Sequence, residues 1–407
     1  MQKLKELYQN RQTDFQETGV ELRAKYGKFS LVRLLVFVIG VAITIYLGSF
    51  AWYWGVLFFL TFVAAFYQFM KWHQRISESA QHNEELARIN GLEIAALNHD
   101  FSQFEHGAKF LEMEHPYALD LDLFGEHSLF QYLNRTSTEI GRQRLAQYLT
   151  EPSSTEVISA RQTAAQELGK KIDWRQHFQA HGRETEDHPT HLQALLSWLQ
   201  DPAFVKDNTW LKIAMYVAPV WFTAALILWL FYLPWQYAIL MLIPPALILQ
   251  RTVQRVNDTH RRTAHAEHML SNYARLIKQV EGGSFEAPLL QKLQAIFLQE
   301  DNSASQKINK LSYLISQLNV RFNAFAVLLN LGGLWDLHWV NGLEKWRAAQ
   351  KKALPEWFSA LQEFEVLSSL GNLTHNHPHW HFPTLTTSRA IEAIGIGHPL
   401  IQRDQVV

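Results

Sequence analysis

The chain has 407 residues, and its 37 basic and 38 acidic side chains give a net charge of -1. Two windows, 34–70 and 213–250, contain no Asp, Glu, Lys, Arg or His. Uncharged apolar runs longer than about 18 residues are typical of membrane spans, so the sequence excludes a purely soluble protein. The charged remainder excludes a protein that lies entirely within a membrane. Cysteine is absent, which excludes disulfides, thiolate metal sites and cysteine nucleophiles.

The first segment and the two uncharged windows predict how the chain meets a membrane. Residues 1–30 alternate charged and apolar side chains, which predicts a short cytoplasmic amphipathic helix. A bilayer core of about 30 Å needs about 20 helical residues, so each window is long enough for two spans. We therefore predict transmembrane helical hairpins at 31–70 and 213–250, with turns near Gly48 and Pro234. Aromatic residues crowd both turns, as they do at membrane interfaces.

Basic residues flank both predicted hairpins on the side opposite the turns. Cytoplasmic loops carry an excess of Lys and Arg, which predicts a multi-pass protein of the cell (inner) membrane whose soluble parts are cytoplasmic. Neither window contains the ionisable side chains that mark transport pathways, so we interpret the hairpins as an anchor in the lipid bilayer. The flanking residues are Lys25, Lys28, Arg33, Lys71 and Arg75 at the first hairpin, and Lys206, Lys212, Arg251 and Arg255 at the second.

The segments between the two windows have helical patterns. Residues 71–127 predict an acidic helical connector, because 76–130 contain 11 acidic and 2 basic side chains. The run Thr136–Glu139 places a hydroxyl three residues before a carboxylate, which predicts a helix N-terminus. The same arrangement at Ser153–Glu156 predicts a second helix, which Gly169 ends.

Two long helices are expected after the second window. The first runs from Arg251 to Glu281. The second begins at Asn302, and its apolar residues recur every three or four positions as far as Leu329, so it should present one continuous seam to a partner helix. The isoleucines and glycines of residues 384–407 predict a short strand and turn.

Two stretches of the soluble sequence carry a recognisable pattern. N-x-T-x-T-x-x-G runs from Asn134 to Gly141, and an Arg-Gln pair follows at Arg161. This block resembles the helical core, or lever, domain of the MutS mismatch-repair family, and residues 365–370 resemble the helix that closes that core. The resemblance covers about residues 115–400. The residues that carry it are His115, Pro116, Asp120, Asp122, Gly125, Asn134, Thr136, Thr138, Gly141, Arg161, Gln162, Glu365, His398 and Pro399.

The resemblance implies a protein that binds mismatched or branched DNA and couples this binding to ATP and Mg²⁺ in a C-terminal ATPase domain. It also implies a homodimer in the complete protein, because the family's ATPase domains pair. This chain has no Walker A loop, since its Gly-Lys pairs at Gly27 and Gly169 lack the glycine spacing and the following hydroxyl. We therefore expect a truncated chain or gene fragment, without the mismatch-reading domain, that binds no cofactor and is not itself an enzyme.

Four alternating histidines form a candidate metal site outside this pattern. An extended strand would place all four imidazoles on one face, where zinc or nickel could take two or three of them. Pro378 and Pro383 favour an irregular linker instead. The histidines are His375, His377, His379 and His381.

Four arginines form a candidate basic patch after the second hairpin. Residues 251–352 contain 14 basic and 8 acidic side chains, a surplus that suits nucleic acid or anionic lipid. The arginines lie so near the predicted membrane that lipid headgroups are the favoured partner. They are Arg251, Arg255, Arg261 and Arg262.

The sequence supports two hypotheses on function. The first is a mainly α, MutS-like core held on a membrane by two hairpins, which acts in DNA repair or recombination in the complete protein. The second is a membrane scaffold that uses the lever core as an interaction platform without binding DNA. The expected segments are 1–30 (amphipathic helix), 31–70 (hairpin 1), 71–127 (connector), 128–212 (first part of the core), 213–250 (hairpin 2), 251–383 (second part of the core) and 384–407 (start of the ATPase domain).

Overall fold

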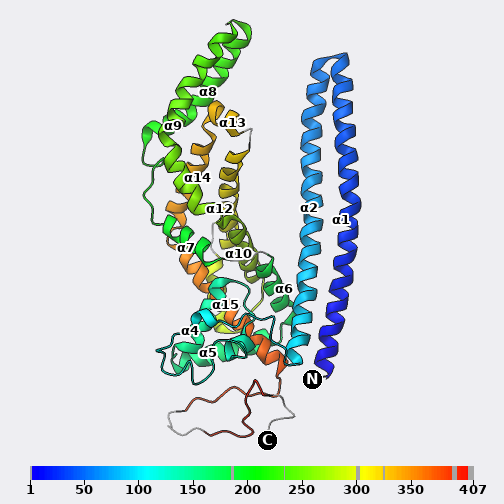
Figure 1. Ribbon diagram of the computed structural model, residues 1–407, viewed down its shortest axis with the longest axis vertical. Helices are drawn as coiled ribbons and strands as arrows, with labels where there is room; N and C mark the ends of the chain where they lie inside the picture. Colours follow the sequence, from blue (N-terminus) through cyan, green and yellow to red (C-terminus); the bar gives the residue numbers. More distant parts are fainter. Residues whose placement is uncertain are drawn as a thin grey trace. The chain divides into compact units, whose positions relative to one another are not determined.

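The computed structural model describes residues 2–184, 188–232, 234–298, 303–323, 326–386 and 392–401, which are mainly helical (Figure 1). The mainly α fold is thus confirmed. The expected strand is wrong for the described part of 384–407, which is irregular, because a strand needs a neighbouring strand for its backbone hydrogen bonds. Two compact units divide the chain. Unit 1 is Met1–Asn134, Arg175–Glu184 and Thr384–Val407, and unit 2 is Arg135–Trp174 and Thr185–Pro383.

Unit 1 is built on two long helices, α1 (Gln2–Phe50) and α2 (Trp52–Leu97), which lie side by side (Figure 1). Ala51 separates them in an extended conformation. Each helix is about 70 Å long at 1.5 Å per residue, more than twice the thickness of a bilayer core. The helix predicted for residues 1–30 is present, but it is not a separate short helix, because α1 continues without interruption into the apolar window.

The apolar halves of α1 and α2 are covered by almost no other part of the protein. Only 6% of the most apolar window of each helix is buried. The two backbones approach closely near the turn, where a Cβ atom on Gly55 would lie 2.9 Å from the Cα atom of Gly48. Small residues at such crossings are typical of helices that pack within a membrane.

The polar halves of α1 and α2 form a stalk with specific contacts. Arg23 makes a bidentate ion pair with Glu84, at 2.5 and 2.7 Å. Phe15 packs on a small core cluster of Leu86 and Ile89 from α2 and Ala180 from α6 (Ile172–Arg183). These contacts fix the register of the stalk.

The helical connector predicted for 71–127 ends at Leu97. The rest of that segment is irregular, apart from the turn η1 (Ala108–Phe110), and is followed by α3 (Leu129–Leu133). Its chain reverses at residues with positive φ angles, His99 at 62° and Gly107 at 67° among them. The residues of an α-helix have negative φ angles, so the helix cannot continue through these positions. The acidic composition of the segment therefore did not indicate its secondary structure.

Unit 2 is a set of helices packed in pairs. The most extensive contacts join α10 with α12, α15 with α4 and α5, and α12 with α14. Phe297, Trp357 and Phe364 are fully buried and form part of its core. The helices are α4 (Glu139–Thr150), α5 (Thr155–Gly169), α7 (Pro189–Trp198), α8 (Thr209–Phe231), α9 (Ala238–Thr263), α10 (Ala266–Glu281), α11 (Pro288–Phe297), α12 (Ala304–Asn319), α13 (Ala326–Gly333), α14 (Trp335–Gln350) and α15 (Ala353–Asn376), with short turns η2 (Trp235–Tyr237) and η3 (Val320–Phe322).

Three helices among the described residues are long and apolar enough to cross a membrane: α1, α2 and residues Thr209–Trp229 of α8. A fourth is counted if α12, η3 and α13 form one broken span, which bends by 106°. The return arm of the predicted second hairpin belongs to α9, which is not among them. Its uncharged part, 238–250, is only about 20 Å long before Arg251. The second hairpin therefore stays a prediction.

Two predicted long helices are interrupted. The helix expected from Asn302 to Leu329 ends at Asn319, and residues 299–302 and 324–325 lie outside the described residues. The Asn319 side chain donates to Glu267 at 2.6 Å and bonds to His260 at 2.9 Å, and α13 then turns onto α8. The helix expected over 251–281 is likewise two helices, α9 and α10, separated at Ala264 and His265.

The close approach of α1 and α2 predicts unequal effects of two alanine substitutions. Gly55→Ala should lower the stability of the helix pair by about 1–3 kcal/mol, because its Cβ atom collides with backbone. Gly48→Ala is the matched control, since the nearest atom lies 4.0 Å away and the gain in helix propensity is the same. Thermal unfolding in detergent, followed by circular dichroism, should separate the two variants. Equal midpoints would contradict the packing.

Candidate functional site

The N-terminus of α4 is capped by side chains from α15. Thr138 is the N-cap residue, and its hydroxyl accepts a hydrogen bond from the backbone N–H of Gly141 at 3.1 Å. The Glu365 carboxylate accepts from the backbone N–H groups of Ser137 (2.9 Å) and Thr138 (3.1 Å), and from the Ser137 hydroxyl at 2.5 Å. We call this arrangement the Glu365 junction. It joins segments that lie more than 200 residues apart in the sequence.

The Glu365 junction is fully buried, which governs its electrostatics. Burial raises the pKa of the Glu365 carboxyl, whereas the hydrogen bonds from Ser137 and Thr138 favour the ionised form and act in the opposite direction. Gly141 lies directly beside the carboxylate, and a Cβ atom there would collide with it. The carboxyl group of the junction can therefore bind a proton, and its hydrogen bonds hold α4 and α15 together. Position 141 has to be glycine, because a larger side chain would collide with the Glu365 carboxylate.

The structure brings together only some of the residues that carry the MutS resemblance. Thr138, Gly141 and Glu365 meet in the junction, and Thr136 is buried next to it in the sequence. The helix begins two residues later than predicted, because Thr138 rather than Thr136 caps it. Helix α5 agrees with the prediction to within one residue at each end, because its N-cap is Ser154 rather than Ser153 and its last residue is Gly169 itself.

The other residues of the resemblance lie elsewhere. Asn134 donates to the carbonyl oxygen of Glu105 at 3.3 Å. Arg161 stacks over the Tyr148 ring at 3.6 Å, and Gln162 donates to the carbonyl oxygen of Pro383 at 3.1 Å. The remaining residues lie in irregular segments of unit 1 and do not join the junction: His115, Pro116, Asp120, Asp122, Gly125, His398 and Pro399.

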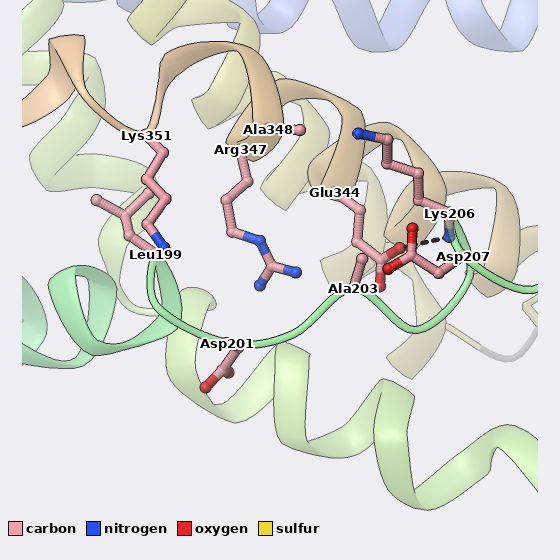
Figure 2. A pocket seen from close by; sticks show the side chains of 9 residues that line it. All are labelled: Leu199, Asp201, Ala203, Lys206, Asp207, Glu344, Arg347, Ala348 and Lys351. Carbon is pink, nitrogen blue, oxygen red and sulfur yellow. Dashed lines mark hydrogen bonds between the residues drawn. The ribbon is translucent and has the colours of Figure 1, made fainter.

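A small cavity in unit 2 gathers charged residues, of which the sequence analysis had singled out only Lys206 (Figure 2). Glu344 of α14 accepts from the backbone N–H groups of Phe204 (2.7 Å), Val205 (3.0 Å) and Lys206 (2.7 Å). Arg347 donates to the carbonyl oxygens of Trp198 and Pro202. The lining residues are Leu199, Asp201, Ala203, Lys206, Asp207, Glu344, Arg347, Ala348 and Lys351.

The hydrogen bonds of Glu344 and Arg347 at this cavity hold segments of the fold together. Its volume of about 170 Å³ is smaller than that of pockets for drug-sized ligands. Glu344 and Arg347 lie three residues apart on α14, and both are engaged by the chain that precedes α8. In the sequence, Glu344 and Arg347 interrupt a mostly apolar face of the helix, and this pattern could have identified them.

The predicted basic patch lies on α9, and two of its four arginines are paired with carboxylates. Arg262 contacts Asp201 at 2.9 Å, and Arg261 contacts Asp258 at 3.1 Å. Arg251 and Arg255 are exposed and follow the apolar part of the helix. The charge available to a polyanion is therefore smaller than the count of basic residues indicates.

The four alternating histidines do not lie on an extended strand. His375 belongs to α15, and its Nδ1 atom lies 3.0 Å from the carbonyl oxygen of Gly169. His377 stacks on Trp380, and His379 and His381 are exposed in an irregular segment. Helix α15 continues as far as Asn376, just before Pro378, and the chain from residue 377 to 386 is irregular, as the two prolines predicted. The extended strand that would place all four imidazoles on one face is not formed.

Comparison with protein-family models, curated proteins and solved structures finds no match to this chain. The resemblance to the MutS family therefore rests on the residues of the chain itself.

The Glu365 junction predicts opposite effects of two substitutions. Glu365→Gln keeps the shape and can keep all three hydrogen bonds, so at neutral pH it should leave the free energy of unfolding unchanged or raise it. Glu365→Ala leaves buried N–H groups without an acceptor and should lower it by about 2–4 kcal/mol. Chemical denaturation in detergent, followed by circular dichroism, measures both.

The same variants predict a pH dependence. The folded pKa of Glu365 lies above its ordinary value of 4.5, so the folded state binds the proton more tightly than the unfolded state. The stability contributed by this group is fully present below that value and is lost as the pH rises through the raised pKa. The advantage of Glu365→Gln over the wild type should therefore grow with pH. An advantage that shrinks would contradict a raised pKa.

Proposed function

We propose that this chain attaches a MutS-like helical core to a membrane. The observation that carries the attachment is the apolar surface of α1 and α2, which holds no charge from residue 34 to 70 and is almost entirely uncovered by protein. A bilayer is the environment that stabilises such a surface. The charged stalk, with its Arg23–Glu84 ion pair, then lies in water beyond the headgroups.

Helix α13 supports a second membrane contact in unit 2. It packs on the apolar helix α8, where Gly332 lies against the ring of Phe222 and Gly333 against Pro219. Val327 and Leu328 on α13 are more than 60% exposed. We infer that α13 enters the apolar layer beside α8 as a short helix that does not cross it, since eight residues extend only about 12 Å.

The MutS-like part of the proposal is supported by the Glu365 junction. The two stretches that carry the resemblance, 134–141 and 365–370, supply the carboxylate, the hydroxyl and the glycine that meet there. In a complete protein of this kind, the core would couple ATP binding in a further domain to the binding of branched or mismatched DNA, in a homodimer.

A scaffold that does not bind DNA is the second candidate. The ion pairs of Arg261 and Arg262 favour it, because they neutralise half of the basic patch. The exposed pair, Arg251 and Arg255, adjoins the apolar part of α9 and suits anionic lipid headgroups.

The anchor predicts a definite topology, with the turn between α1 and α2 outside and the stalk in the cytoplasm. The chain has no cysteine, so single cysteines are specific probes. A membrane-impermeant maleimide should label Ser49→Cys in intact cells and Ser79→Cys only after lysis. The wild-type chain controls for background labelling. Labelling of Ser79→Cys in intact cells, with Ser49→Cys protected, would reverse the topology.

DNA binding by this chain is expected to be weak, salt-sensitive and indifferent to mismatches. Affinity without base recognition comes from neutralising phosphates, and each contact adds about 0.9 to the slope of log affinity against log salt. Binding of plain, mismatched and branched duplexes to the chain in nanodiscs should differ by less than about tenfold, or 1.4 kcal/mol. A larger preference would show that the core alone recognises DNA structure, and would exclude the scaffold.

A further inference from the structure

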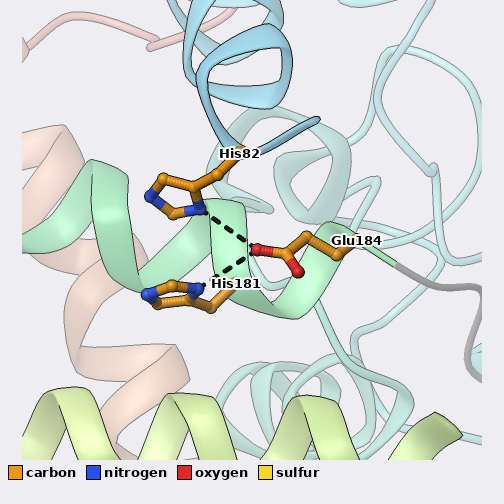
Figure 3. Close-up of side chains that lie close together, drawn as sticks. All are labelled: His82, His181 and Glu184. Carbon is orange, nitrogen blue, oxygen red and sulfur yellow. Dashed lines mark hydrogen bonds and ion pairs between the residues drawn. The ribbon is translucent and has the colours of Figure 1, made fainter. Parts of the chain in front are cut away.

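Three side chains with metal-binding atoms converge in unit 1: His82 from α2, His181 from α6 and Glu184, which directly follows α6 (Figure 3). The Nδ1 atom of His82 lies 3.1 Å from Oε1 of Glu184, and the Nδ1 atom of His181 lies 3.2 Å from the same oxygen. Among the residues that the structure describes, this is the one group of three or more such side chains whose ligand atoms all lie within 4.8 Å.

The spacing of these atoms fits a tetrahedral metal ion. Zinc bonds to imidazole nitrogen and carboxylate oxygen are about 2.0–2.1 Å long, which places neighbouring ligand atoms about 3.3 Å apart. The two separations between histidine and Glu184, 3.1 and 3.2 Å, are close to this value, and all three ligand atoms lie within 4.8 Å of one another. A small opening of the three side chains would therefore admit the ion without moving either helix.

A third histidine, His177, orients His82. The Nε2 atom of His82 lies 2.8 Å from Nδ1 of His177, so His82 can bind a metal through Nδ1 while its other ring nitrogen donates to His177. Metal-binding histidines almost always have such a partner. The imidazole rings of His82 and His181 stack with centroids 4.3 Å apart, which further restricts their rotation.

The site is enclosed but reachable from solvent. The exposed fractions of the side chains are 16% for His82, 24% for His181 and 7% for Glu184. This burial distinguishes the group from a chance cluster on an exposed surface, where the side chains would be free to separate. The helix repeat explains part of the arrangement, because His177 and His181 lie four residues apart on one face of α6. Glu184 follows directly after the last residue of this helix, Arg183.

We propose that His82, His181 and Glu184 bind a divalent zinc ion, with a water molecule at the fourth position. Two imidazoles and one carboxylate are a known ligand set for zinc with an open position. The ion would join the stalk helix α2 to the C-terminal end of α6. It is independent of the histidine run at 375–381.

Cobalt(II) is a spectroscopic probe for this site, because tetrahedral cobalt absorbs visible light far more strongly than hydrated cobalt. The full chain, purified in detergent without a histidine tag and stripped of metal, should bind one cobalt ion with tetrahedral absorption, and one equivalent of zinc should displace it. The same zinc should raise the thermal unfolding midpoint of the chain. Absence of tetrahedral absorption, or of saturable zinc binding, would overturn the proposal.

Variants distinguish this site from other histidines. His82→Gln, His181→Gln and Glu184→Gln should each weaken zinc binding at least about 100-fold, and His177→Gln about 10–100-fold, as for the partners of metal-bound histidines. The double variant His379→Gln/His381→Gln is the matched control and should bind like the wild type. Circular dichroism in EDTA checks that each variant folds. Binding that is lost in the control and kept in properly folded His82→Gln and Glu184→Gln would overturn the proposal.

Discussion

The structure depends on an apolar surface that the protein does not cover. More than twenty large apolar side chains between Leu31 and Tyr67 are exposed on α1 and α2. Leaving one such side chain in water costs about 1.5–3 kcal/mol relative to burial, so their sum exceeds the whole stability of a typical domain, about 5–15 kcal/mol. A bilayer removes this penalty. Because the two helices are more than twice as long as a bilayer core is thick, the stalk then lies outside the bilayer.

Within unit 2, glutamate carboxylates at the starts of helices are a recurring means of fixing the packing. Glu365 receives the N-terminus of α4, and Glu344 receives the segment before α8. Glu167 accepts from the backbone N–H groups of Glu286 and Ala287 before α11, and Glu281 accepts from that of Ser305 in α12. Backbone N–H groups at helix starts have no partner within the helix, so the carboxylates at the starts of α4, α11 and α12 satisfy such groups and specify which helices meet. Glu344 does the same for a turn that lies before α8.

Local signals in the sequence were sufficient for some elements. The uncharged window at 34–70 predicted the turn near Gly48. The run Ser153–Glu156 and Gly169 marked the ends of α5 to within one residue, because caps and glycines act on the nearest turn of the backbone. Periodicity failed at Asn319, where contacts with Glu267 and His260 from other helices coincide with the end of α12. Tertiary contacts of this kind are absent from any local pattern.

The candidate sites likewise combine residues that the sequence identified with contacts that only the structure shows. Thr138, Gly141 and Glu365 all stood out in the sequence, but their contact could be found only once α15 was placed against α4. The histidine run at 375–381 was conspicuous because its residues alternate, yet they do not share a face. His82 and His181 lie 99 positions apart, and only the packing of α6 on the stalk brings them together.

The depth of individual residues in a bilayer tests the membrane account most directly. Nitroxide labels at single cysteines in place of Val38, Leu60 and Val327, all exposed apolar residues, would be compared with one in place of Asn83 on the stalk, in lipid nanodiscs. The account predicts that the first three labels collide more often with oxygen, which concentrates in lipid, than with a water-soluble nickel chelate, and that the label at residue 83 does the reverse. Predominant collision of the labels at 38 and 60 with the nickel chelate would contradict it.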